Sequence, residues 1–66
     1  MKPYVLFNEF GTWYHTTRTN FNNYLRNTRQ IQKWEGFADV AEIREYWNRY
    51  LPGNFDDDVE VIQSEV

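Results

Sequence analysis

Catalysis would have to begin at His15, the only histidine in this 66-residue chain. No cysteine is present to pair with it. The hydroxyls of Thr12, Thr16 and Thr17 are potential nucleophiles, but a nucleophile needs a positioned base, and the base needs a group that orients it. A single imidazole does not make that arrangement. We therefore expect no catalytic site and interpret His15 as a residue on the surface of a sheet.

Three consecutive aspartates form the densest block of charge: Asp56, Asp57 and Asp58. A calcium loop places its oxygen ligands at alternating positions around a glycine turn, followed by a distant glutamate. Consecutive side chains diverge instead, so we expect no metal site. The three glycines are isolated and form no phosphate-binding loop, so we expect no cofactor either. Another use for such a block is to keep the edge of the following strand from pairing with other chains.

Charge is divided unevenly along the chain, although the formal net charge is only −3. Residues 1–33 carry five basic side chains against one acidic, and residues 34–66 carry two basic against nine acidic. If the acids gather on one surface, that surface would steer the protein toward a basic groove in a partner. The aromatic residues among them are of the type that dominates interface energies. The acids could equally serve only to keep a small protein in solution. The predicted partner-binding residues are Glu42, Glu45, Tyr46, Arg49, Tyr50, Phe55, Asp56, Asp57 and Asp58.

The basic half of the chain suggests a different function, which is the binding of single-stranded nucleic acid. Aromatic side chains on a sheet can stack on unpaired bases while nearby arginines contact the phosphates. The negative total charge argues against this alternative, because nucleic-acid-binding domains are usually basic. The residues that would carry it are Tyr14, Arg18, Tyr24, Arg26 and Arg29.

A hairpin is predicted at the start of the chain. Residues 4–7 and 12–17 are rich in β-branched and aromatic side chains, as strands are. Asn8 at the first position of the connecting turn and Gly11 at the fourth favour a type I turn, with Gly11 supplying the positive φ of a bulge. If Asn8 pairs with Thr12, one face of the hairpin is shared by Val5, Phe7, Trp13 and His15.

The main helix is predicted at residues 39–51. Asp39 followed by Glu42 makes a capping box at its start, and Pro52-Gly53 ends it. Its apolar stripe repeats at helical spacing and consists of Val40, Ile43, Trp47 and Leu51. The sheet residues expected to pack on this stripe are Val5, Phe7, Trp13, Val59 and Val61.

Three weaker elements complete the pattern. Residues 19–29 predict one or two turns of helix, capped by Thr19 or Asn20 and weakened by asparagines. Residues 30–34 are either a third strand or a continuation of that helix. Residues 59–63 predict a closing strand, with the loop 54–58 before it.

The sequence therefore predicts one α+β domain spanning residues 1–66, with the order β-β-(short α)-β-α-β. A small antiparallel sheet, made of the hairpin plus one or two further strands, would pack on one main helix. The apolar run near the N-terminus is too short for a signal peptide or a membrane span, so we expect a cytoplasmic protein without a membrane partner.

One resemblance covers nearly the whole chain. The stretch YVLFNEFGTWYHTTRTNFNNYLRNTRQIQKWEGFADVAEIREYW, followed by VEVI, resembles the small orphan proteins that bacteriophages encode. The resemblance implies a stand-alone product that acts by stoichiometric binding, as anti-CRISPR, other anti-defence and host-takeover proteins do. Some of those proteins present acidic surfaces that occupy nucleic-acid grooves. The resemblance assigns a role to no individual residue.

Our first hypothesis is a non-enzymatic inhibitor that engages a host or defence protein, including a nucleic-acid-binding one, through its acidic, aromatic-containing surface. The alternative is the single-strand nucleic-acid binder. A homodimer built by pairing a sheet edge is compatible with both.

Overall fold

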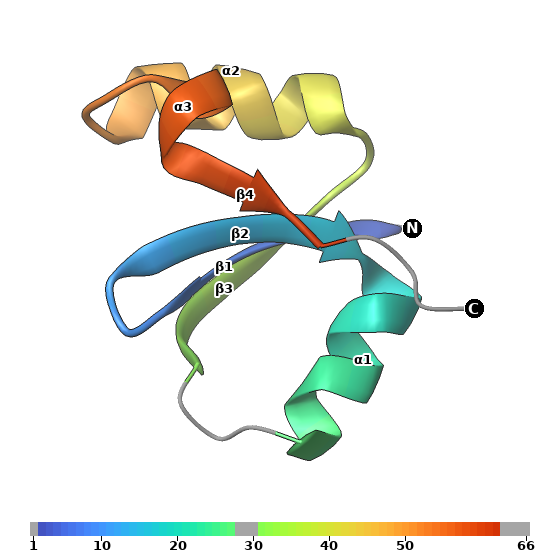
Figure 1. Cartoon of the computed structure of the whole chain (residues 1–66). Helices are drawn as coiled ribbons and strands as arrows, with labels where there is room; N and C mark the ends of the chain where they lie inside the picture. Colours follow the sequence, from blue (N-terminus) through green and yellow to red (C-terminus); the bar gives the residue numbers. More distant parts are fainter. Residues whose placement is uncertain (1, 28–30, 63–66) are drawn as a thin grey trace.

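A hairpin of two strands is followed by helices and further strands in this computed structural model, which describes residues 2–27 and 31–62 (Figure 1). The elements are β1 (Tyr4–Glu9), β2 (Thr12–Thr17), α1 (Arg18–Asn27), β3 (Ile31–Phe37), α2 (Val40–Tyr50), α3 (Phe55–Asp58) and β4 (Val59–Val61). The strands form one sheet in the order β3-β1-β2-β4. The predicted α+β class is confirmed, and the segment left open between strand and helix is strand β3 from Ile31 onward.

The sheet is mixed rather than wholly antiparallel. β1 pairs antiparallel with both β2 and β3, as the prediction required. β4 instead runs parallel to β2, and it therefore points in the same direction as β3. Parallel strands need a long crossover connection, usually a helix, and α2 lies in that connection. Two predicted strand ends, Gln30 and Gln63, lie outside the described residues.

The hairpin turn differs from the prediction by one residue. Glu9 pairs with Thr12, so the turn contains only Phe10 and Gly11. Both have positive φ, 53° and 84°, as a type I′ turn requires. The predicted positive φ at Gly11 is confirmed, but the type I turn and the pairing of Asn8 with Thr12 are wrong. Asn8 acts through its side chain, whose Oδ1 accepts a hydrogen bond from the Gly11 N–H at 3.0 Å.

The one-residue change of register moves each β1 side chain to the opposite face of the sheet from the one predicted. The reason is that successive side chains of a strand point to opposite faces. Val5 and Phe7 point toward α1 and not toward the α2 stripe as expected. Leu6 takes their place beneath α2, together with Trp13 and Val59. Val61 was also expected there, but it is 58 % exposed.

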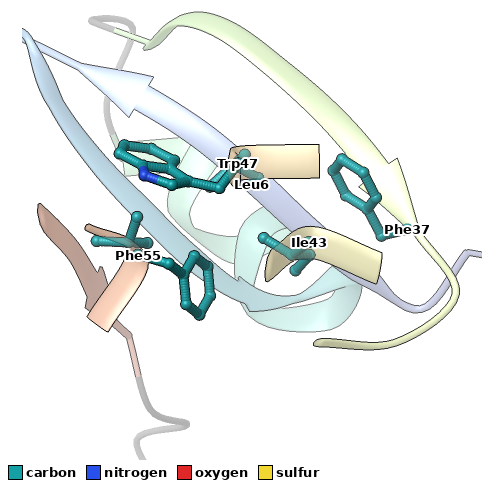
Figure 2. Packing of buried hydrophobic residues seen from close by; sticks show 6 residues of the cluster. Leu6, Phe37, Ile43, Trp47 and Phe55 are labelled. Atoms are coloured by element: carbon teal, nitrogen blue, oxygen red, sulfur yellow. The ribbon is translucent and has the colours of Figure 1, made fainter. Parts of the chain in front are cut away.

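Helices cover both faces of the sheet, which gives the molecule three layers (Figure 1). α1 closes one face over a buried cluster of Val5, Phe7 and Phe21. α2 and α3 close the other face over a larger cluster (Figure 2), whose buried members are Leu6, Phe37, Ile43, Trp47, Phe55 and Val59. The expectation of one main helix was therefore incomplete. α1 is ten residues long, longer than the one or two turns expected, because its buried face offsets the weak helix propensity of its asparagines.

The limits of α2 follow the prediction closely. Asp39 is the N-cap, and its Oδ1 accepts a hydrogen bond from the Glu42 N–H at 2.9 Å. Leu51 is the C-cap, and its N–H donates to the Trp47 carbonyl at 2.9 Å. Within the described ranges, no helix is long and apolar enough to cross a membrane.

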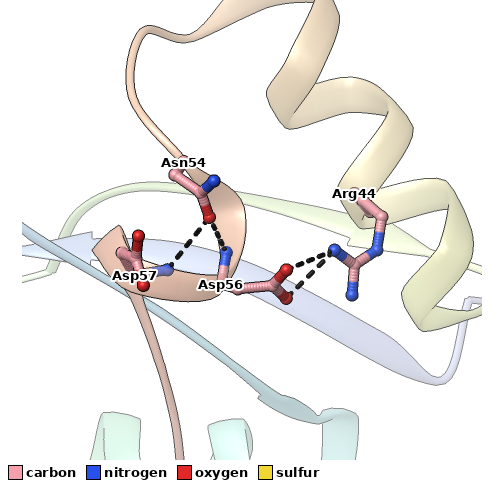
Figure 3. A network of polar contacts seen from close by, with 4 residues as sticks. All are labelled: Arg44, Asn54, Asp56 and Asp57. Carbon is pink, nitrogen blue, oxygen red and sulfur yellow. Dashed lines mark hydrogen bonds and ion pairs between the residues drawn. The ribbon is translucent and has the colours of Figure 1, made fainter.

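The segment predicted as the loop 54–58 contains the short helix α3. Asn54 caps it, since its Oδ1 accepts hydrogen bonds from the N–H groups of Asp56 at 2.9 Å and Asp57 at 3.3 Å (Figure 3). Asn is among the preferred N-cap residues, and acidic side chains in a first turn suit the positive end of a helix. The aspartates thus help to start a helix at this position.

Candidate binding groove on helix α2

A shallow groove of about 340 Å³ lies where the outer side of α2 meets the end of β3. Its lining residues are Phe37, Glu42, Glu45, Tyr46, Arg49 and Tyr50. All of them except Phe37 were predicted to bind a partner. Phe37 was missed because the third strand was predicted to end at Trp34, which left Phe37 outside any element.

Helical spacing brings the α2 residues of the groove together. Residues three and four apart are neighbours on a helix surface, and Glu42, Glu45, Tyr46 and Arg49 are related in this way. Phe37 reaches them from β3, because the chain turns directly from β3 into α2. The groove is therefore built on a strand and a capped helix, which fix the backbone positions of its residues.

Three aromatic rings form one wall of the groove. The centroids of Phe37 and Tyr46 are 5.3 Å apart, with an interplanar angle of 63°. The centroids of Tyr46 and Tyr50 are 5.0 Å apart, at 49°. Both distances lie in the range of favourable aromatic pairs. Tyr50 is 64 % exposed, so this row of rings begins at the core and ends in solvent.

Carboxylates stand beside the rings. Glu45 Oε1 lies 3.7 Å from Arg49 Nη2, and both side chains are largely exposed, so the ion pair contributes little to stability. In the described part of the chain, the Glu42 carboxylate has no ion pair. The groove thus places aromatic rings beside carboxylates that can bind another cation at little cost in stability.

The three aspartates of α3 are used differently. Arg44 binds Asp56, with Nη1 3.0 Å from both carboxylate oxygens (Figure 3). This hydrogen bond lowers the pKa of Asp56, and the positive charge of Arg44 adds to the effect. Asp58 Oδ2 accepts a hydrogen bond from the Asn54 N–H at 2.7 Å. All three aspartates are exposed, and two of their carboxylates, those of Asp56 and Asp58, hold α3 in place.

The carboxylates of α3 do not line the groove on α2. Residues two apart on a helix point about 200° apart, so Arg44 and Tyr46 lie on opposite sides of α2. Asp56 is bound to Arg44 and therefore lies on the side of α2 away from the groove. Phe55 is only 6 % exposed and packs among the core residues, so it is not the surface anchor that the sequence suggested.

The two tyrosines of the nucleic-acid alternative are not free on an open sheet surface. The rings of Tyr14 and Tyr24 pack on Phe7, at centroid distances of 5.2 and 5.4 Å, on the sheet face that α1 covers. The Tyr24 hydroxyl donates a hydrogen bond to Glu9, which is the main cause that raises the pKa of Tyr24 to about 12. Arg18 and Arg26 lie on α1; Arg29 lies outside the described residues.

His15 is buried, which corrects the expectation of a surface histidine. Its ring stacks on Phe55 with centroids 5.4 Å apart. Burial lowers the pKa of His15, and the charge of Arg44 lowers it further. The neighbouring hydroxyl of Thr16 donates to the Ile62 carbonyl at 2.9 Å, so it serves the packing of the strand end. Among residues 2–27 and 31–62, no three potential metal ligands cluster.

Comparisons with models of protein families, with curated proteins and with solved structures found no match for this chain.

Proposed function

We propose that this protein acts by non-enzymatic binding, and that the α2 groove receives a lysine or arginine side chain from a basic segment of a partner protein. The observation that supports this most is the meeting of three aromatic rings with Glu42 and Glu45 in one groove. A cation over an aromatic ring is attracted by the ring's negative face. A carboxylate beside the ring adds a charge-assisted hydrogen bond.

In this proposal the partner is a host or defence protein that works through a basic surface, such as one that binds nucleic acid. The formal net charge of −3 favours encounter with such a surface, because complementary charge raises association rates. The resemblance to small phage proteins supports inhibition by stoichiometric occupation of that surface. Asp57 and the other α3 carboxylates contribute to the long-range field but make no contact inside the groove.

The direct test uses peptides, since these need no knowledge of the partner. A lysine-rich peptide, and a matched peptide with glutamate in place of lysine, are titrated into the labelled protein while its amide NMR signals are recorded. We expect shifts at Phe37 and along residues 42–50 with the lysine peptide alone. Tyr50→Ala should weaken binding several-fold, because exposed cation–aromatic contacts contribute about 0.5–1 kcal/mol.

A matched pair of substitutions separates local contact from total charge. Glu42→Gln and Asp57→Asn each remove one negative charge, but only Glu42 lines the groove. We expect Glu42→Gln to weaken binding clearly more than Asp57→Asn. Equal losses from the two variants would show that only net charge matters, and absence of shifts around the groove would contradict the proposal. Capture from a bacterial lysate with wild-type and Tyr50→Ala baits then identifies the partner.

Nucleic-acid binding has less structural support, because α1 covers the sheet face that would have stacked on bases. A labelled oligonucleotide titration at low salt separates the two functions. Binding of the oligonucleotide that weakens steeply with added salt would support the nucleic-acid-binding function. We expect no binding.

A further inference from the structure

Strand β3 forms an open edge of the sheet. It lies outside β1 in the strand order and is seven residues long. Its central residues Lys33, Trp34 and Glu35 are all exposed. The opposite edge, β4, has only three residues. An exposed edge strand presents unpaired backbone groups and can pair with another strand.

The hydrogen bonds of the sheet show which backbone groups of β3 face outward. The Arg18 N–H donates to the Pro3 carbonyl at 2.7 Å and extends the β1–β2 ladder by one pair. Hydrogen-bonded and non-hydrogen-bonded pairs alternate along antiparallel strands, so odd residues of β1 bond toward β2 and even residues bond toward β3. Leu6 lies opposite Glu35. The backbone of Glu35 therefore faces β1, and that of Trp34 faces the free edge.

Charges on either side of Trp34 are self-complementary. Lys33 and Glu35 are two residues apart and lie on the same face of the sheet. We infer that β3 pairs antiparallel with β3 of a second copy, about a two-fold axis at Trp34. Each Lys33 then lies opposite the other copy's Glu35, and the two Trp34 residues exchange backbone hydrogen bonds, as a symmetric interface requires.

The neighbouring registers are disfavoured by charge. An axis at Lys33 would place lysine opposite lysine, and an axis at Glu35 would place glutamate opposite glutamate. Opposite charges across an antiparallel pair stabilise it, whereas like charges destabilise it. Lysine on an edge normally discourages pairing, but Glu35 makes this lysine one half of a complementary pair.

Trp34 supplies apolar surface at the axis. Its ring is held 5.2 Å from that of Phe21 and 5.1 Å from the guanidinium carbon of Arg18, yet 47 % of the residue stays exposed. The pairing is short, because a shift of register beside Asn8 leaves Gln32 without a partner in β1, and such a bulge bends the edge. The inference does not depend on the α2 groove.

Sedimentation equilibrium over a range of concentrations tests the dimer. We expect the wild type to associate, and Glu35→Lys to weaken association by about tenfold, because it replaces two attractive pairs by two repulsive ones. The double variant Lys33→Glu/Glu35→Lys should restore association, since it exchanges the charges without changing their pairing. Only the axis at Trp34 predicts this restoration.

Cross-linking gives a second measurement. The chain has no cysteine, so a single introduced cysteine can form a disulfide only with another copy. Hydrogen-bonded antiparallel residues have Cα atoms about 5.5 Å apart, a separation that suits a disulfide. Trp34→Cys should therefore cross-link on mild oxidation, and Ala41→Cys on α2 should not.

Three results would overturn the inference. The first is a wild-type protein that stays monomeric at the highest concentration at which it remains dissolved. The second is association that Glu35→Lys leaves unchanged, which would place the interface elsewhere. The third is a double variant that remains as weak as Glu35→Lys. Circular dichroism of each variant confirms that a loss of association is not a loss of folding.

Discussion

At the residue scale, His15 shows how burial changes the meaning of a titratable side chain. It lies beneath the α2 and α3 layer, stacked on Phe55, with the charged Arg44 nearby. Burial and that charge both disfavour the imidazolium, so the pKa of His15 is lowered in the folded protein. The physical effect is on stability, because the unfolded chain keeps the ordinary pKa of about 6.5.

The sign of the pH dependence follows from this shift. Below pH of about 6.5 the unfolded chain binds a proton at His15 that the folded protein resists, so the free energy of unfolding falls as the pH decreases. The stability contributed by this residue is fully present above pH of about 6.5. It is lost as the pH falls from there to the lowered pKa of the folded protein. Urea denaturation of the wild type and His15→Phe at pH 7.5 and 5.5 checks it. We expect a smaller loss in the variant; equal losses would assign the effect to carboxylates.

At the element scale, the hairpin turn explains why the register was not predictable from the sequence. Type I′ turns favour Asn-Gly and similar pairs, since both central residues need positive φ. Here the first of them is Phe10, with φ of 53°, a conformation that costs an ordinary residue roughly 1–2 kcal/mol. Propensity therefore pointed to Asn8 as the turn residue. The actual turn begins one residue later, at Glu9.

The strain at Phe10 leads to a prediction about stability. Phe10 is 72 % exposed, so removal of its ring loses little burial. Phe10→Asn should raise the free energy of unfolding by about 0.5–1 kcal/mol, because Asn tolerates positive φ far better than Phe. Phe10→Ala is the matched control, as it removes the ring without favouring the turn. Urea denaturation measures both. If Asn gains no more stability than Ala, the turn is not strained.

Elements with local signals were the ones that the sequence predicted well. The start of α2 was predicted from Asp39 and Glu42, because a capping box needs only neighbouring residues. The groove residues on α2 were found for the same reason, since helical spacing alone places them together. The sequence analysis did not predict that Arg44 binds Asp56, twelve residues later in the chain, and so offsets the charge of one expected surface carboxylate. Such pairing depends on how α3 packs against α2, which no local pattern contains.

The direction of β4 was missed although the sequence carried a hint of it. A strand, a helix of ten or more residues and another strand usually make a parallel crossover, and residues 31–61 follow that order. The prediction treated the closing strand as part of an antiparallel sheet. It missed the crossover because the third strand was left undecided between strand and helix.

At the scale of the whole molecule, the two hydrophobic clusters share one strand. β1 directs Val5 and Phe7 into the α1 cluster and Leu6 into the α2 cluster. A chain of 66 residues buries only about 60 % of the surface that its unfolded form exposes, and its stability is correspondingly marginal. Loss of either layer should therefore destabilise the other. We therefore expect the layers to unfold together.

Phe21→Ala tests this coupling. Phe21 is fully buried against Phe7 and Trp34, and its truncation should cost about 3–5 kcal/mol, a large part of the stability of a small domain. The side-chain NMR signals of Ile43 and Trp47, which lie on the other side of the sheet, should lose their native shifts together with those of α1. Phe10→Ala removes the same ring from an exposed site and should leave them unchanged. If Ile43 and Trp47 keep native shifts while α1 unfolds, the α2 layer folds independently of α1.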